Sequence, residues 1–196
     1  GELSAAQAQF LQHTLMPVVV AEWARPLSVE RVDGPLLLDR PCDYVWNDAS
    51  GCALQCSSVI AQPTCLDIAM PDEHFAATTY CASGHDEGCA STAAGAGVDD
   101  ADFVVYVSAS ATATCEGAAV AYAVTCFTDQ FDRPVAGGIN FCPSSLGTSW
   151  DASQCVRTDA RARARARGRR RGPRRSLASL RYVVAMHELG HALGFA

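Results

Sequence analysis

The sequence has no run of about 20 apolar residues, the length that a helix needs to cross a bilayer, and this absence excludes an ordinary membrane-spanning segment. Its first ten residues, GELSAAQAQF, lack the basic start and the apolar run of a secretory signal peptide. Lysine is also absent, so every basic residue is arginine. We interpret this as a bias of composition that identifies no function. No two cysteines form a CxxC pair, the pattern most typical of thiolate zinc ligands.

What the sequence does contain is enough apolar material for one domain of ordinary size. With 196 residues, 49% of them hydrophobic, the chain can bury a sizeable core. The net charge of −6 conceals an asymmetry, because residues 1–156 carry 19 acidic residues and 4 arginines, whereas residues 157–196 carry 2 and 11. An acidic body argues against a nucleic-acid-binding surface outside the arginine-rich part. We therefore expect no nucleic-acid partner.

Ten cysteines are spread through the acidic part of the chain, at positions 42, 52, 56, 65, 81, 89, 115, 126, 142 and 155. Their even number and scattered spacing favour structural disulfides, which form in oxidising compartments. Thiolate zinc binding is the alternative, and its nearest candidates are Cys52 with Cys56 and the group Cys81, His85 and Cys89. We predict disulfides, and with them an exported protein whose signal peptide lies upstream of Gly1.

The first hundred residues divide into two parts. Residues 1–40 are predicted to form a helix and a strand: an amphipathic helix over 4–24, capped by Ser4 and kinked near Pro17, and a short strand over 27–32. Residues 41–100 are predicted to be cysteine-rich loops with short strands held by disulfides. His13 falls in the first part, and we interpret it as a surface or packed histidine. His74 and His85 fall in the second part, and we interpret them as solvated surface groups, not as metal ligands.

Residues 101–156 have the β-branched and aromatic runs of strands. DFVVYVSA, from Asp102, is predicted to be the clearest buried strand, and residues 118–127 and 135–141 to be neighbouring strands joined by a turn. Residues 157–175 form an arginine-rich insertion with no apolar face, which predicts a solvated loop. Binding of nucleic acid or another polyanion by this tract is the alternative.

The residues that carry chemistry lie near the C-terminus, in the segment 176–196. Apolar residues recur there at helical spacing, so His187 and His191, four residues apart, lie on one face of the predicted helix, where both can bind one zinc ion. Glu188 can reach a water on that ion, accept its proton and return it to a departing amine. Gly194 is placed where the helix must stop.

HELGHALGF resembles the zinc helix of the metzincins, and specifically of the leishmanolysin family of surface metallopeptidases. DADFVVYVSA and DRPVAGGINFCPSSL resemble the strand before that family's active site and its segment with a Gly-Ile-Asn core. The similarity spans about residues 100–196. It implies an α+β, metzincin-like catalytic subdomain with a twisted mixed sheet, an active-site helix and disulfide-stabilised loops. It further implies zinc held by His187, His191 and a third histidine, with Glu188 as general base and peptide substrates extended along an edge strand.

The short metzincin pattern would place the third histidine at position 197, and leishmanolysin-like enzymes supply it after a long insertion, followed by a methionine turn. We therefore expect the third ligand beyond Ala196, and we expect residues 1–196 to be an incomplete catalytic domain that binds zinc weakly and is inactive alone. The predicted function of the whole protein is that of a zinc metalloendopeptidase acting on proteins outside the cell or at its surface, with membrane association through other segments. The alternatives are a non-catalytic adhesion module and a polyanion-binding protein.

Overall fold

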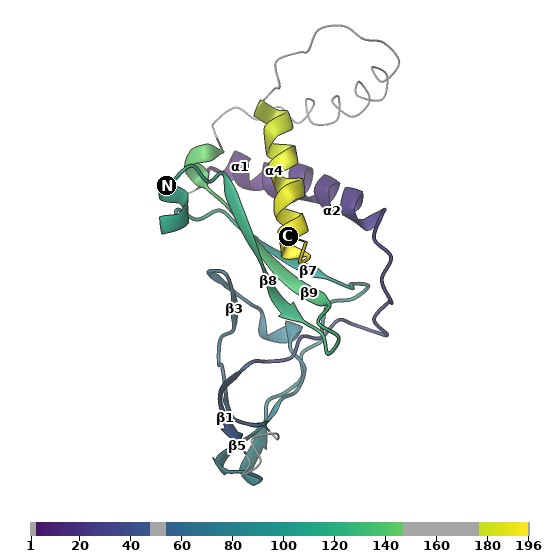
Figure 1. Cartoon of the computed structure of the whole chain (residues 1–196), viewed down its shortest axis with the longest axis vertical. Coiled ribbons are helices and arrows are strands. Elements are labelled where there is room, and N and C mark those ends of the chain that lie inside the picture. Colours follow the sequence, from purple (N-terminus) through teal and green to yellow (C-terminus); the bar gives the residue numbers. More distant parts are fainter. Residues whose placement is uncertain (1–2, 48–53, 147–176, 196) are drawn as a thin grey trace, which may run out of the picture. The chain divides into compact units, whose positions relative to one another are not determined.

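The computed structural model describes residues 3–47, 54–146 and 177–195 (Figure 1). The chain divides into two compact units. The helical unit comprises Gly1–Ser28, Val107–Thr125 and Gly138–Ala196, and the hairpin unit comprises Val29–Tyr106 and Cys126–Gly137. Within the described residues no helix is long and apolar enough to span a membrane.

The helical unit begins with three consecutive helical segments: α1 (Ala5–Phe10), the π-helical turn η1 (Leu11–Leu15) and α2 (Met16–Ala24). Ser4 caps α1 as predicted, because its side chain accepts from the N–H of Gln7 while the Gln7 side chain accepts from the N–H of Ser4. Pro17 has no N–H to bond to the turn before it, and the wide turn η1 lies immediately before α2. The irregularity predicted near Pro17 is therefore a π turn.

A three-stranded sheet joins β7 (Val104–Ser108), β9 (Pro134–Phe141) and β8 (Ala121–Thr128), in that order, and each strand contributes residues to both units. β8 and β9 are connected by a turn of five residues, which is too short for a parallel crossover, so they form the predicted antiparallel pair. The prediction that β7 is the clearest buried strand is wrong. Only Tyr106 of β7 is fully buried, whereas β9 is buried from Val135 to Phe141 because it lies between the other two strands.

In its described residues the hairpin unit contains three antiparallel hairpins, where loops with short strands held by disulfides were predicted. They are β1 (Cys42–Asn47) with β2 (Leu54–Val59), β3 (Thr64–Cys65) with β4 (Ile68–Ala69), and β5 (Thr79–Gly84) with β6 (Glu87–Ser91). The described residues also form short 3-10 turns. The turn η2 (Asp72–His74) lies in the hairpin unit, and the turns η3 (Ala113–Glu116) and η4 (Pro143–Ser145) lie in the helical unit. The core of the hairpin unit is apolar and includes Leu36, Leu38, Met70, Phe75, Tyr106 and Val135.

The strand predicted over residues 27–32 does not form. Bonds to side chains hold this segment, and no strand pairing does. The N–H of Val32 donates to Asp102, and Arg31 pairs with Asp100 and Asp102. Arg133 donates to the carbonyl of Glu30. Backbone bridges begin further along the chain, where Leu36 pairs with Val98 and Leu38 with Phe75.

Four disulfides confirm the interpretation of the cysteines. They join Cys42 to Cys56, Cys65 to Cys126, Cys81 to Cys89, and Cys115 to Cys142. The thiolate alternative for Cys81 and Cys89 is therefore wrong, because both sulfurs are used in one bond. Cys52, Cys155 and the arginine-rich insertion 157–175 lie outside the described residues. The helices, the strands and the four disulfides confirm the predicted α+β class with disulfide-stabilised loops.

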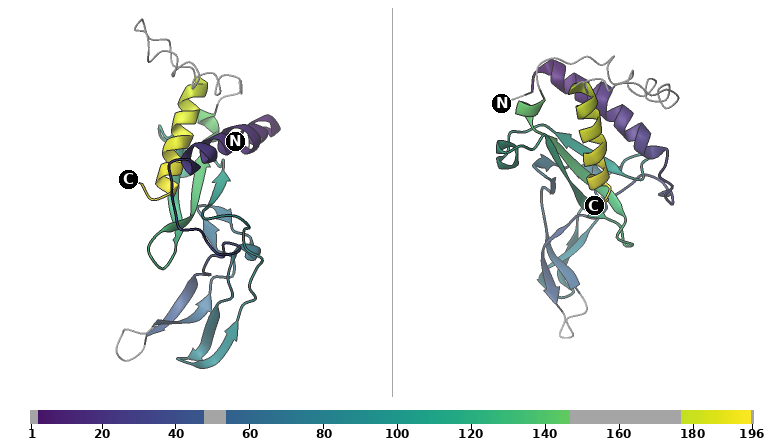
Figure 2. Two further views of the ribbon diagram at one scale, coloured as in Figure 1. Left: turned by 90° about the vertical axis from the view of Figure 1, so that its right-hand side faces the viewer. Right: turned by 45° about the horizontal axis from the view of Figure 1, so that its top comes forward.

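Helix α4 (Leu177–Ala192) carries the HELGH sequence and lies against α2 (Figures 1 and 2). It ends as Gly194 predicted, because Gly194 has a φ of +84° and begins a Schellman turn. In that turn the N–H of Gly194 donates to the carbonyl of His191, and the N–H of Phe195 donates to the carbonyl of Gly190. The chain consequently folds back beneath the last turn of α4.

Candidate metal centre

The helix brings His187 and His191 together on one face, as their spacing predicts. Their Nε2 atoms lie 3.0 Å apart, and their ring centroids 4.4 Å apart. The two rings are nearly perpendicular, with an interplanar angle of 80°. His187 is exposed and His191 is half-buried. The two nitrogens therefore converge on one point at the edge of the helix that solvent can reach.

The end of α4 fixes which nitrogen of His191 is available. Its Nδ1 lies 2.9 Å from the carbonyl oxygen of Phe195. A carbonyl can only accept, so Nδ1 carries the hydrogen and the neutral ring presents the lone pair of Nε2. A ligating histidine ordinarily donates its other ring N–H in this way, to a carbonyl or a carboxylate. The Schellman turn therefore prepares His191 to bind a cation through Nε2.

The geometry of this pair fits a zinc ion. Two nitrogens at about 2.0–2.1 Å from one tetrahedral ion lie about 3.3 Å apart. The measured separation of 3.0 Å departs from that value by a few tenths of an ångström, which small rotations of the two rings supply. His187 and His191 would thus hold the ion, and they are two of the three protein ligands of a catalytic zinc site.

Glu188, between the two histidines in sequence, is 8% exposed. Burial raises the pKa of its carboxyl group, and the neighbouring His187 and His191 act in the opposite direction. A general base works best when its pKa approaches the operating pH. The environment of Glu188 therefore moves it in the direction that proton transfer requires.

Three groups that sequence reasoning missed support this end of α4. The hydroxyl of Thr125 in β8 donates to the carbonyl of Ala192 over 3.1 Å. The indole N–H of Trp23 in α2 donates to the carbonyl of Met186 over 2.9 Å. The third group is the Phe195 carbonyl itself. Trp23 falls in the amphipathic helix predicted over 4–24, but nothing local connects it to a residue 163 positions away.

The Gly-Ile-Asn segment is structural in the described residues. Asn140 of β9 is buried and accepts from the hydroxyl of Ser108 and the N–H of Ser110, both over 2.8 Å. Its amide also donates to the carbonyl of Ser110 over 3.0 Å. Asn140 therefore fixes the chain that leaves β7, and it satisfies its own polar atoms in doing so.

His13 and His85 are exposed, as predicted, whereas His74 is half-buried and not the solvated group that was predicted. His13 is exposed on η1, His74 lies 2.6 Å from the Tyr106 hydroxyl, and His85 pairs with Asp86 at the surface. Within residues 3–47, 54–146 and 177–195, no group of three or more His, Cys, Asp or Glu side chains is arranged to hold a metal ion.

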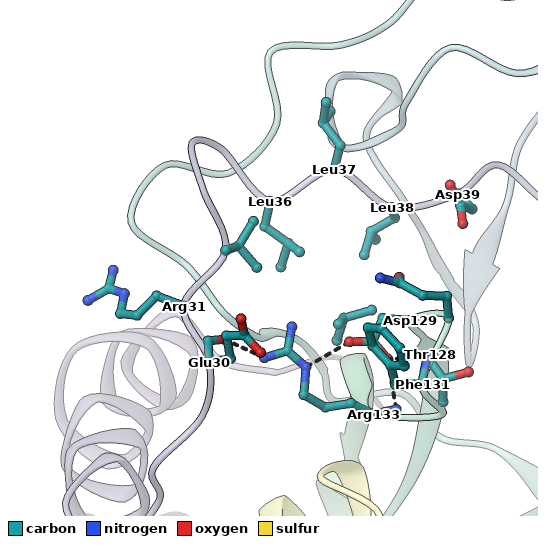
Figure 3. A pocket seen from close by; sticks show the side chains of 13 residues that line it. Glu30, Arg31, Leu36, Leu37, Leu38, Asp39, Thr128, Asp129, Phe131 and Arg133 are labelled. Atoms are coloured by element: carbon teal, nitrogen blue, oxygen red, sulfur yellow. Dashed lines mark hydrogen bonds and ion pairs between the residues drawn. The ribbon is translucent and has the colours of Figure 1, made fainter.

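A separate cavity of about 620 Å³ lies in the hairpin unit (Figure 3). One wall is the extended segment Leu36–Asp39, and the other is the β8–β9 turn with the exposed Phe131. Arg133 lies across one end, bonded to Asp129 and to the carbonyl of Glu30. Its lining contains no histidine, so this cavity supplies no imidazole ligand.

Comparison with known proteins identifies the family. A sequence model of the leishmanolysin family, peptidase M8, matches residues 78–171, a range that ends before α4. A leishmanolysin-like peptidase of Drosophila pseudoobscura pseudoobscura is 31% identical over 204 residues, which cover 99% of this chain and 25% of that protein. One of Caenorhabditis elegans is 33% identical over 153 residues, 74% of this chain and 22% of that protein.

A ciliated left-right organizer metallopeptidase of Xenopus laevis is also similar, with 33% identity over 180 residues, 87% of this chain and 21% of that protein. The chain thus spans about a quarter of the length of the curated relatives that it matches. The alignment with the Drosophila protein extends over nearly every residue of this chain. It therefore includes the HELGH helix, which lies outside the range that the family model matches. On the sequence similarity, the four disulfides and the α+β fold, this chain belongs to the leishmanolysin family.

Proposed function

We propose that this chain supplies part of the active site of a zinc metalloendopeptidase that hydrolyses peptide bonds of protein substrates. One observation carries the proposal: the Nε2 atoms of His187 and His191 converge to 3.0 Å while the Nδ1–H of His191 is held by a carbonyl. One zinc ion bound there supplies a Lewis acid, which polarises the scissile carbonyl and lowers the pKa of water. The third ligand lies outside the residues that the structure describes.

Glu188 is proposed as the general base. Its carboxylate accepts one proton from the attacking water, whose oxygen forms the new bond to the carbonyl carbon of the substrate. The C–N bond then breaks, and Glu188 returns the proton to the departing amine. Burial beside the histidines supports this role because it favours the protonated form that the second step needs.

Export to an oxidising compartment is part of the proposal, and the four disulfides support it. The substrates would be proteins or peptides at the cell surface or outside the cell. Polyanion binding by residues 157–175 stays a prediction outside the described residues. A non-catalytic module with the same fold is the competing proposal, and it requires no turnover.

The proposal is tested on the full-length gene product by measuring bound zinc and peptide cleavage. His187→Ala and His191→Ala should each lose most bound zinc and most activity, because a site with one fewer imidazole binds the ion far more weakly. His85→Ala is the matched control, since His85 pairs only with Asp86 at the surface of the hairpin unit. Zinc retention by both α4 variants would refute the site. Wild-type protein with zinc but no turnover would favour the non-catalytic module.

A further inference from the structure

Trp23 contacts α4 where the two histidines are held. Its indole N–H donates to the carbonyl of Met186, the residue before His187, over 2.9 Å. α2 and α4 pack against each other within the helical unit (Figure 2). The bond therefore crosses from one helix to the other at the residue that precedes the first ligand.

The same indole lies against Gly190, the residue before His191. A Cβ added at Gly190 would lie 3.2 Å from Cζ2 of Trp23 and 3.6 Å from Cη2. The first distance is closer than carbon atoms ordinarily approach. Glycine at this position of HELGH thus lets the indole reach the surface of α4 beside the residue that precedes His191.

Trp23 also stacks on Phe195. The ring centroids are 5.4 Å apart and the planes differ by 17°. Phe195 is the residue whose carbonyl oxygen holds Nδ1 of His191. Movement of Phe195 would therefore move the acceptor that sets the tautomer of the second ligand.

Two of these contacts, those with Gly190 and Phe195, are made to residues of the Schellman turn. Such a turn is usually fastened by an apolar contact between the residue after the glycine and a residue in the last turn of the helix. Here the residue after the glycine is Phe195, and one of the two helix positions that it ordinarily contacts is Gly190, which has no side chain. Trp23 takes the place of the missing side chain, because it touches Gly190 on one side and Phe195 on the other.

We propose that Trp23 is a positioning residue of the zinc site. It holds the Met186 carbonyl before His187, and it fastens the turn whose carbonyl orients His191. It touches neither metal nor substrate. This inference rests on the proposed zinc peptidase function, and it extends that function to a residue of the first helix.

The test compares Trp23→Phe with Trp46→Phe in the full-length gene product. Trp46 is a matched control because its indole N–H donates an equivalent bond, over 2.6 Å, to the carbonyl of Cys81 in the hairpin unit. The measurements are zinc affinity by competition with a chelator, the visible spectrum of the Co²⁺-substituted protein, and kcat and KM for a peptide. Thermal unfolding of the metal-free proteins serves as the check on folding.

Trp23→Phe should weaken zinc binding by about 10-fold, as loss of groups outside the first ligand shell does. It should also change the Co²⁺ spectrum and lower kcat more than it raises KM. Trp46→Phe should lower only the thermal midpoint. A Trp23→Phe protein that loses thermal stability yet keeps the zinc affinity and the Co²⁺ spectrum of the wild type would overturn the proposal.

Gly190→Ala tests the contact from the other side and does not depend on how well Trp23→Phe folds. The added methyl should displace the indole and weaken zinc binding, and this loss should shrink when Trp23→Phe is also present, because the smaller phenyl ring leaves room. Unchanged zinc affinity in Gly190→Ala, or an equal loss in both backgrounds, would contradict the inference. If His187→Ala binds zinc as the wild type does, the zinc site itself is refuted and the inference falls with it.

Discussion

The Nδ1 atom of His191 and the carbonyl oxygen of Phe195 are 2.9 Å apart, so the turn that ends α4 also selects the tautomer of a candidate zinc ligand. A backbone atom four residues beyond the histidine does this, at a position set by the positive φ of Gly194. The end of the helix and the chemistry of the site are therefore one structural feature.

The Gly194→Ala substitution should destabilise the end of α4 and weaken zinc binding. Forcing a residue with a Cβ into the left-handed region costs about 1–2 kcal/mol, so chemical denaturation should give a lower free energy of unfolding. Zinc affinity should fall as well, because Phe195 would shift. Gly117→Ala is the matched control, since Gly117 has a negative φ and nothing within 4 Å of an added Cβ. Equal zinc affinity in the two variants would show that the turn at Gly194 does not affect the zinc site.

Asn140→Ala should lower the free energy of unfolding by about 2 kcal/mol or more, because it leaves the N–H and carbonyl of Ser110 without their partner. Ser108→Ala removes one bond from the same group and should cost about 1 kcal/mol. Urea denaturation of the two variants gives the comparison. A larger loss in the serine variant would contradict this account of Asn140.

The disulfides should differ in their contribution to stability according to the chain they close. Cys65–Cys126 spans 61 positions and Cys81–Cys89 spans 8. The chain-entropy relation gives about 4 kcal/mol for the first and about 2.5 kcal/mol for the second. Double alanine variants of each pair, unfolded in urea, should keep that order. The reverse order would show that effects in the native state outweigh loop length.

Burial of the Tyr106 hydroxyl should make the folded protein less stable at high pH. Burial raises the pKa of its hydroxyl to about 12 from 10.0, so the folded state favours the neutral phenol. The contribution is fully present below pH 10 and is lost as the pH rises through 12. Phenolate absorbance should reveal a tyrosine that titrates near pH 12, and Tyr106→Phe should remove that step. Loss of a step near pH 10 in that variant would contradict the prediction.

Local rules predicted the parts of this structure whose causes are local. The spacing of His187 and His191, the stop at Gly194 and the cap at Ser4 each depend on a few neighbouring residues, and each was found. The β1–β2 and β5–β6 hairpins fall in the segment predicted as loops with short strands. Each is cross-linked by a disulfide, and the spacing of the cysteines did not reveal which of them pair.

Contacts between segments that are distant in the chain could not be predicted from the sequence. Trp23 falls in the predicted helix 4–24, but its bond to Met186 depends on how α2 and α4 pack. The burial of β9 likewise depends on its central place in the sheet, which the Gly-rich run 135–141 does not reveal. The third zinc ligand and the methionine turn stay predictions.

The central claim is that Glu188 moves the proton at a zinc ion held by His187 and His191. The most direct measurement is zinc content and peptide turnover of the full-length Glu188→Gln protein, since glutamine keeps the shape of the side chain and cannot act as the base. We expect zinc bound as in the wild type and turnover lower by about 100-fold or more. Turnover equal to that of the wild type, with zinc still bound, would contradict it.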